Sequence, residues 1–290
     1  MATKIHKKDK RIMALLILPS ILGMTIFFII PFVWMIYLSF NEVSPQGRSF
    51  GLGNYIGLFG NSSFKLAVNN TVLFTIISVP LIIAVSLLLA IMLNKKIKFK
   101  RQLRTSFVIP LVVPTASIIL FFEMIFDTKG LINAVVKSFG FDAINWLNSE
   151  YALFVIVTMF IWKNVGYNII LFWSGLQNIP KEYYEAASID GASAFQKFFR
   201  ITLIYLMPTT FFVLIISIIN SFKVFKEIYL MAGAYPHQSI YMLQHFMNNL
   251  FFKLDYYKLV SAAIIMMIVI ASFVFVMFKI QNRISEVIDG

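Results

Sequence analysis

The chain has 290 residues, of which 59% are hydrophobic and only 13% are charged, and its formal net charge is +12 at pH 7. Soluble domains carry about 25% charged residues, so this composition excludes an ordinary soluble domain and indicates an integral membrane protein. Cysteine is absent, which excludes disulfides, a thiolate nucleophile and cysteine metal sites. The histidines, His6, His237 and His245, are too dispersed to predict a metal site.

Six long apolar segments predict membrane-spanning helices, because a span needs about 20 consecutive apolar residues. No strand-like alternation competes with them, and a helix satisfies all its backbone groups within a bilayer. The expected fold is therefore an all-α integral membrane protein, with six transmembrane helices in one domain over residues 1–290. The spans cover roughly residues 12–40, 66–94, 105–126, 152–175, 201–222 and 259–279.

Lysine and arginine set the expected orientation of these spans. With the N-terminus inside, the inner segments hold twice as many of these residues as the outer loops. The basic run at residues 95–104 is the strongest signal, and we interpret it as a cytoplasmic anchor rather than a lipid or nucleic-acid site. The basic residues 1–11 precede a long apolar run without a small-residue cleavage site, which favours an uncleaved first helix over a signal peptide. Both termini are thus expected in the cytoplasm.

Prolines within four of the spans predict kinks, since proline cannot donate a backbone hydrogen bond. They are Pro19, Pro31, Pro80, Pro110, Pro114 and Pro208.

Polar residues inside spans are costly in lipid and usually face a cavity. Asn164 and Asn168 lie four residues apart, as do Ser217 and Ser221, so each pair shares one helix face. Amides, hydroxyls and aromatic faces suit a sugar, but the same groups also hold membrane helices together, and both interpretations stay open. Lys163 either reaches the interface or pairs with a carboxylate. Glu123 in the third span has the same two possibilities, and we expect it to lie near the outer surface. The candidate substrate path comprises Phe160, Trp162, Lys163, Asn164, Tyr167, Ser217, Asn220 and Ser221.

The largest inner connection, residues 178–208, predicts a helix, a glycine turn and a second helix. Pro180 suits the first helical position, before a helix over 181–189, and Gly191 suits the left-handed residue that closes it. Ser193 can cap a second helix that runs to about Arg200. The loop is rich in apolar side chains, which fits a helix pair in the headgroup region or a docking surface for a cytosolic partner.

The sequence Glu185-Ala186-Ala187, followed by Gly191, Ile201 and Leu203, resembles the EAA loop of binding-protein-dependent ABC permeases. Other segments resemble sugar permeases of the maltose/glycerol-3-phosphate type, more the first partner of the permease pair than the second. Two segments depart from that pattern: Ile204 stands where the family usually has proline, and Ala232–Pro236 replaces a Thr-x-Gly-Gly-Pro loop. The matching segments include Ser39-Phe40, Gly53-Asn54-Tyr55, Asn70-Thr71, Gly130–Asn133, Trp162–Gly166 and Ser221–Phe225.

This resemblance implies a type I ABC importer permease of a bacterial cytoplasmic (inner) membrane, whose loop is a coupling helix that docks in a cleft of the ATPase. It implies spans four and five as the lining of the substrate site. The expected partners are a second six-helix permease in a heterodimer, two cytosolic ATPase subunits and an extracytoplasmic solute-binding protein. The implied ATPase-coupling residues are Glu185, Ala186, Ala187, Asp190 and Gly191.

The expected role is translocation of a sugar, oligosaccharide or related polyol by alternating access. Since no Gly-x-x-x-x-Gly-Lys-Ser/Thr phosphate loop is present, ATP hydrolysis and its Mg²⁺ belong to a partner, and we expect no catalytic residue, cofactor or metal on this chain. Nucleic acid is not an expected partner, and clusters typical of membrane enzymes are not seen. The alternatives are an ABC permease for a non-sugar solute and an ion-coupled secondary transporter. The second would need carboxylates within the spans, and Glu123 is the only candidate in the sequence, which disfavours it.

Overall fold

The computed structural model describes residues 7–44, 47–95, 98 and 100–289. The chain divides into two compact units: Met1–Asn61 with Leu250–Ile268, and Ser62–Asn249 with Val269–Gly290. Helices dominate both units, and the part of the chain that the structure describes contains one two-stranded sheet. The all-α fold predicted from the sequence is confirmed, while His6 and Lys96 lie outside the described residues.

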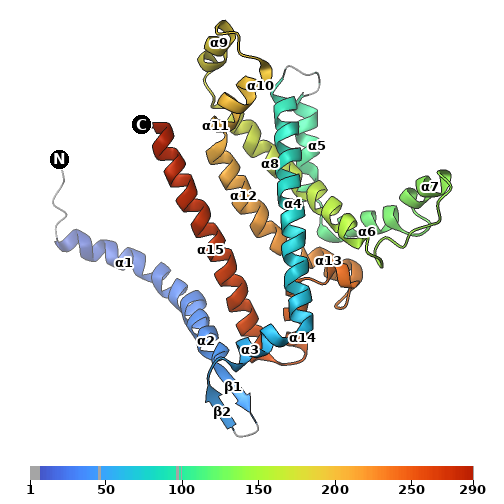
Figure 1. Cartoon of the computed structure of the whole chain (residues 1–290). Coiled ribbons are helices and arrows are strands. Elements are labelled where there is room, and N and C mark those ends of the chain that lie inside the picture. The colour runs from blue at the N-terminus through green and yellow to red at the C-terminus, as the bar shows by residue number, and fades with distance from the viewer. Residues whose placement is uncertain (1–6, 45–46, 96–97, 99, 290) are drawn as a thin grey trace. The chain divides into compact units, whose positions relative to one another are not determined.

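The first unit contains the first predicted span, a run of helical segments that is apolar from Leu15 to Ser39 and has no buried residue within its most apolar stretch. A β-hairpin follows it and pairs Asn41 with Phe50. Four-residue strands give too short an alternation for the sequence pattern to predict them. The elements are α1 (Lys7–Met24), the π-helix η1 (Thr25–Ile29), α2 (Ile30–Ser39), β1 (Asn41–Ser44), β2 (Gly47–Phe50) and α3 (Gly53–Gly60) (Figure 1).

Polar side chains fasten the end of α2 to α3 and to the beginning of α15 (Tyr256–Asp289). The Asn54 amide donates to the carbonyls of Ser39, at 3.1 Å, and Asn41, at 2.8 Å. The hydroxyl of Ser261 donates to the same Ser39 carbonyl at 3.1 Å, and the Tyr55 hydroxyl bonds to Ser39 Oγ at 2.8 Å. Ser39, Asn54 and Tyr55 are residues of the sugar-permease resemblance, and in the structure their hydrogen bonds hold the end of α2 to neighbouring elements.

The second unit is organised by the packing of α4 (Ser62–Asn94) along α8 (Ala152–Gln177). Phe74 and Ile82 of α4 are fully buried in one cluster with Ile156, Met159 and Phe172 of α8. The other elements that lie wholly in this unit are α5 (Lys100–Val112), α6 (Thr115–Phe126), α7 (Leu131–Ser138), α9 (Lys181–Ile189), α10 (Ala194–Lys197), the π-helix η2 (Phe198–Thr202), α11 (Leu203–Tyr205), α12 (Met207–Phe222), α13 (Phe225–Ala232) and the 3-10 helix η3 (Gln238–Ile240). Both α14 (Leu243–Phe252) and α15 contribute residues to each unit.

Within the described residues, four helices are long and apolar enough to cross a membrane, and six spans result if each of two bent pairs is one span. Kinks were predicted in the third and fifth spans, and the structure has a sharp bend in each, so that each span consists of separate helices. Lys100–Val112 meets Thr115–Ser138 at 102°, and Ala194–Tyr205 meets Met207–Ala232 at 67°. Proline accounts for both breaks: Pro114 precedes α6 in an extended conformation, and Pro208 has no N–H to bond the carbonyl of Ile204.

Gly166 lets α8 approach the backbone of α5 closely, as small residues do between membrane helices. A Cβ atom at Gly166 would lie 1.7 Å from the carbonyl oxygen of Phe107. We therefore expect Gly166→Ala to push the helices apart and to lower stability by about 3 kcal/mol or more, the upper part of the usual range for overpacking. Thermal unfolding in detergent measures this change. Gly23→Ala is the matched control, since a Cβ there meets nothing within 4 Å; equal melting temperatures for the two variants would contradict the prediction.

Candidate functional site

A pocket in the second unit gathers charged and amide side chains from α8, from the end of α12 and from α13. It contains two ammonium groups, one carboxylate, two amides and one aromatic ring. The lining residues are Met159, Phe160, Lys163, Asn164, Asn220, Lys223, Val224 and Glu227. Four residues of the predicted substrate path therefore meet at one place: Phe160, Lys163, Asn164 and Asn220.

An ion pair between Lys163 and Glu227 forms one wall of this pocket and joins α8 to α13. The side chain of Glu227 is 9% exposed and that of Lys163 is 24% exposed. A carboxylate buried to this degree is costly unless a cation compensates it, so each charge requires the other. The sequence left open whether Lys163 reaches the membrane interface or pairs with a carboxylate, and in the structure it pairs with Glu227.

Lys223 adds a second ammonium group to the lining, and no carboxylate of the described residues pairs with it. Asn220 and Asn164 place amides in the same pocket; the Asn164 amide also donates to the carbonyl of Phe160, at 2.8 Å. The pocket thus offers donors, acceptors and the face of one ring, which is the mixture that small polar ligands require.

Three hydroxyl and amide residues on the same helices instead connect helices to one another. The Asn168 amide donates to Ser217 Oγ at 3.0 Å, and Ser221 Oγ bonds to Thr75 Oγ1 of α4 at 2.9 Å. Asn168, Ser217 and Ser221 are all buried. For Ser217 and Ser221 the structure therefore favours helix–helix bonding over a place in the pocket, because their spacing put them on the face that packs on α4 and α8.

Trp162 and Tyr167 also lie apart from the pocket lining. Trp162 is 38% exposed and stacks on Phe121 of α6, with ring centroids 5.9 Å apart. Tyr167 is 39% exposed. Of the three aromatic side chains proposed as faces for a sugar, only Phe160 lies at the pocket.

Glu227 was missed because the apolar run of the fifth span ends at Phe222, which placed residues 223–258 in an outer loop. Glu123, proposed as the one carboxylate within a span, is half-buried in α6 and forms no ion pair among the described residues. A signal for Glu227 did exist: Lys223 and Glu227 have the four-residue spacing of one helix face, and an unpaired lysine lay within the fourth span.

The helix predicted over 181–189 is confirmed as α9, and its closure follows the Schellman pattern. The Ala192 N–H donates to the Ala187 carbonyl at 2.8 Å, and Gly191 between them has φ +73°. Pro180 differs slightly from the prediction, since it is the N-cap residue and not the first helical residue.

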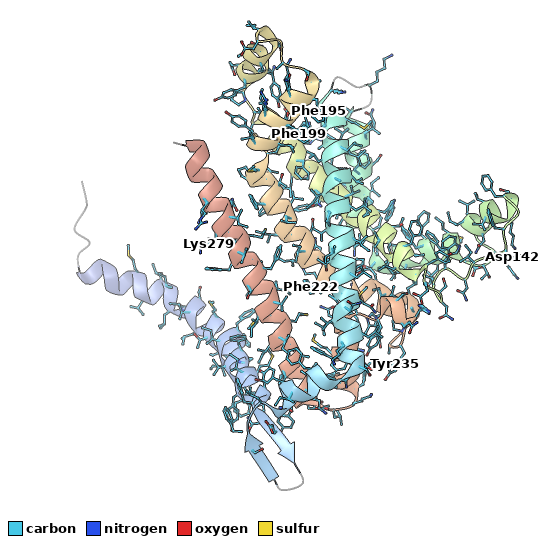
Figure 2. All side chains as sticks on the ribbon, viewed as in Figure 1. Asp142, Phe195, Phe199, Phe222, Tyr235 and Lys279 are labelled. Atoms are coloured by element: carbon cyan, nitrogen blue, oxygen red, sulfur yellow. The ribbon has the colours of Figure 1, made fainter. Side chains whose placement is uncertain are left out.

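Ser193 caps α10 as predicted, through a capping box with Gln196. Lys197 Nζ donates to Ser188 Oγ at 2.7 Å, which fastens the second helix to α9. The loop presents a strongly apolar outer surface: Ile189 is 87% exposed and Phe195 71% exposed, with the Phe199 ring 4.4 Å from that of Phe195 (Figure 2). A rigid, exposed apolar surface of this kind is typical of a docking site.

The candidate coupling residues lie on or beside this surface. Glu185, Ala186, Asp190 and Gly191 are exposed, and Ala187 is half-buried. Ala187, Asp190 and Gly191 line a shallow hollow together with residues of α10 and η2. No ion pair within the described residues occupies the carboxylate of Glu185, so this charge is available to a partner.

The basic segment after α4 lies at the same end of the second unit as the docking surface. Figure 1 shows α9 and α10 beside the end of α4 and the start of α5. Gln177 Nε2 donates to Asn94 Oδ1 at 2.7 Å, and Lys95, Tyr184 and Lys197 line one hollow. Helix α13, which contributes Glu227 to the pocket, lies towards the opposite end of this unit (Figure 1).

His245 of α14 packs against the α13 helix that carries Glu227. Its Nδ1 accepts the Met242 N–H at 3.2 Å, and its ring lies 4.7 Å from that of Phe225. Its Nε2 is buried and has no hydrogen-bond partner among the described residues. Burial lowers the pKa of His245 to about 4, because the protonated ring loses its hydration. The described residues contain no group of three or more potential metal ligands.

We expect the stability of the protein to fall as pH decreases from about 6.5 to 4, since the unfolded chain then binds a proton that folded His245 does not. The full effect is on the order of 3 kcal/mol, and the contribution is fully present above about pH 6.5. Melting temperatures measured across this range check the sign. His245→Phe should flatten the slope and His237→Phe, the matched control, should not; an unchanged slope in His245→Phe would contradict the prediction.

Comparison with known proteins gives a family for this architecture. The family model described as "Binding-protein-dependent transport system inner membrane component" matches residues 82–286. The chain is 40% identical to the arabinooligosaccharides transport system permease protein AraP of Bacillus subtilis over 218 residues, 73% of this chain and 69% of that protein. It is 31% identical to the trehalose/maltose transport system permease protein MalF of Thermococcus litoralis, over 97% of both chains.

A solved structure has the same fold. A chain in the crystal structure of a bacterial ABC transporter that imports the acidic polysaccharide alginate superposes with a TM-score of 0.81 over 96% of both chains, at 22% identity. A chain in the crystal structure of a bacterial alginate ABC transporter in complex with an alginate pentasaccharide-bound periplasmic protein superposes with a TM-score of 0.80, also at 22% identity and over 96% of both chains. At this identity, the likeness concerns the fold alone.

Proposed function

The chain belongs to the family of binding-protein-dependent transport system inner membrane components, and from this membership we propose that it moves a sugar, oligosaccharide or related polyol by alternating access. As a permease subunit, it is not the component that hydrolyses ATP. Support for the sugar class comes from relatives named for arabinooligosaccharides and for trehalose/maltose. A relative named for sn-glycerol-3-phosphate, 30% identical over 93% of this chain, extends the class to polyol derivatives.

The main observation in support of solute recognition by this chain is the pocket lined by Lys163, Asn220, Lys223 and Glu227. A hydroxyl-rich solute exchanges many hydrogen bonds with water for bonds with the protein, so its path needs charged and amide groups that can replace them. The pocket supplies both and places the Phe160 ring beside them. We propose that the solute contacts Phe160, Lys163, Asn164 and Asn220, together with Lys223 and Glu227.

The surface formed by α9 and α10 is proposed as the contact for a cytosolic ATPase. Its exposed Ile189, Phe195 and Phe199 can enter an apolar cleft, while Glu185 supplies a carboxylate at the edge. Closure of an ATPase dimer would push this surface, and the breaks at Pro114 and Pro208 give the long helices places at which to bend. Glu185, Ala186, Ala187, Asp190 and Gly191 carry this coupling in the proposed mechanism.

The proposed topology places this surface, the 95–104 segment and both termini in the cytoplasm. Helices α9 and α10 lie at the same end of the second unit as the start of α5, which supports this topology. The most basic segment and the proposed ATPase contact then both face the cytoplasm, as the preference of lysine and arginine for the inner side requires. The proposed partners are a second permease, two ATPase subunits and an extracytoplasmic binding protein. Energy conversion and solute capture both lie outside this chain in this scheme.

An ion-coupled carrier was disfavoured from the sequence because Glu123 was the one carboxylate assigned to a span. The buried Glu227 removes that reason. Membership of this family of binding-protein-dependent permeases now disfavours the ion-coupled carrier instead. An ABC permease for a non-sugar solute remains the second candidate.

The test is to purify the tagged chain in mild detergent, identify its companions by mass spectrometry and reconstitute the assembly with its binding protein. We expect a second permease and an ATPase with a phosphate loop to co-purify, and ATP-dependent uptake that unlabelled sugars inhibit by competition. Uptake by the chain alone, driven by an ion gradient without ATP, would establish the carrier instead. ATP-driven uptake that only a peptide or an amino acid inhibits would support the second candidate.

A further inference from the structure

A continuous groove on the flank of α5 is basic at one end and apolar at the other. Two adjoining hollows make it, and they share Thr105 and Val108. The basic part is lined by Arg101, Arg104, Thr105, Val108 and Ile170, and the apolar part by Thr105, Val108, Ile109, Val112, Val113 and Pro114. Neither the proposed solute pathway nor the docking surface uses this groove.

The basic end holds cations that lack acidic partners. The Arg104 guanidinium lies 3.9 Å from the centroid of the Trp173 ring, and Lys100 Nζ lies 5.3 Å from the same ring. None of Lys100, Arg101 and Arg104 forms an ion pair within the described residues. The Arg104 guanidinium packs over the Trp173 ring and donates no hydrogen bond to another described residue, which favours a planar or tetrahedral anion such as a phosphate as its partner.

The apolar end exposes side chains that a soluble ligand would not cover. Ile109 is 53% exposed and Val112 is 80% exposed, and almost all of the surface in this part of the groove is carbon. From Arg101 to Val112, α5 advances about 16 Å at 1.5 Å per residue. That length is close to one leaflet of the hydrocarbon core, about half of 30 Å.

We propose that this groove binds one anionic phospholipid, with its phosphate at Arg101 and Arg104 and an acyl chain along Val108, Ile109 and Val112. This inference goes beyond the proposed transport function and requires neither ATP nor the solute. The sequence interpretation of residues 95–104 as a simple anchor is thereby revised, because a diffuse basic field attracts many lipids, whereas a groove holds one. Trp173, which contacts Lys100 and Arg104 at the basic end, fits the interfacial position that tryptophan prefers.

Native mass spectrometry of the full purified assembly, after stepwise delipidation, tests this with dioleoyl phosphatidylglycerol and dioleoyl phosphatidylcholine. We expect one phosphatidylglycerol to be retained per chain, and the Arg101→Gln/Arg104→Gln variant to bind it at least about tenfold more weakly. Lys95→Gln/Lys98→Gln is the control, since it removes the same charge from the same segment outside the groove. Val108→Trp should also weaken retention by filling the groove, while glycerol phosphate, which lacks acyl chains, should not displace the lipid.

If the assembly retained the two lipids equally, or if Lys95→Gln/Lys98→Gln weakened retention as much as the arginine pair, the proposed lipid site in the groove would be wrong. The basic residues would then attract anionic lipids only through their general positive charge. Retention that survives both the arginine pair and Val108→Trp would place the lipid elsewhere. Melting temperatures of each variant separate loss of the site from loss of the fold. Because the measurement uses no uptake, its failure would leave the proposed function intact, and failure of ATP-driven uptake would leave the lipid result intact.

Discussion

Replacing Gly191 with valine is expected to abolish most ATP-driven uptake while leaving the chain folded in the membrane. Gly191 has φ +73°, and the space around it is open, so the obstacle is backbone conformation and not crowding. Left-handed geometry costs an L-residue about 1–2 kcal/mol, and a β-branched residue tolerates it least. A penalty of that size reduces the ratio of closed to open turn by a factor of about 5–30.

The loss should be local because the Schellman turn is the connection between α9 and α10. If the turn opens, the bond from the Ala192 N–H to the Ala187 carbonyl is lost, and Ile189 and Phe195 no longer form one surface. Uptake and solute-stimulated ATP hydrolysis are measured in the same liposomes. Uncoupling is seen as a loss of ATP-driven uptake in Gly191→Val relative to the unsubstituted protein. Gly191→Asn should retain most activity, since asparagine adopts the left-handed region readily.

Gly140→Val is the matched control, because Gly140 also has a left-handed conformation, φ +82°, and open space around it, but follows α7. This variant should leave binding of the ATPase unchanged. Normal uptake by Gly191→Val would remove the basis for assigning coupling to this turn. Loss of the protein from the membrane in Gly191→Val would indicate a folding role instead.

The helices of this protein could be predicted where one physical signal dominates. Long apolar runs predicted α4 and α8 closely, and the residues Pro180, Gly191 and Ser193 predicted the helix–turn–helix, because proline, left-handed glycine and N-cap serine each act within a few residues. The bends were only half predicted. Proline indicated that α5 and α12 would be kinked, but the angles of 102° and 67° depend on packing that no local pattern contains.

The pocket was harder to predict because helical periodicity reports which residues share a face and not what that face meets. Asn164 and Asn168 both lie in the fourth span, yet Asn164 lines the pocket and Asn168 bonds to Ser217. Residues of the family resemblance show the same limit. Asn133 is fully buried and bonds to the carbonyls of Asp127 and Ile144, so that motif residue closes a loop.

The second large effect is expected from separating Lys163 and Glu227. Lys163→Met leaves the Glu227 carboxylate 9% exposed without its cation, and we expect a loss of about 3 kcal/mol in stability, together with most of the uptake. Glu227→Gln should be milder, since Lys163 is 24% exposed and can turn towards water. Asp255→Asn is the control, because its pair with Lys258 is more exposed and is worth about 0–1 kcal/mol.

A double variant decides what the pair does. Lys163→Met/Glu227→Leu removes both charges, and we expect it to recover most of the stability lost in Lys163→Met, since a buried pair can be replaced by apolar side chains of similar volume at little cost. Thermal unfolding in detergent measures this recovery. A double variant no more stable than Lys163→Met would show that the two charges do not depend on each other.

Uptake by the same double variant distinguishes two roles of the ion pair: a structural link between α8 and α13, and direct contact with the solute. If the pair is only a structural link, any two side chains that pack well can replace it, so uptake would return together with stability. A group that bonds to the solute cannot be replaced by a methyl group, because the solute would then lose a hydrogen bond that it makes in the pocket. We expect uptake to stay low while stability returns, since Lys163 and Glu227 face the same pocket as Asn164, Asn220 and Lys223. Full recovery of uptake would reduce the pair to a structural link and confine recognition to the remaining lining residues.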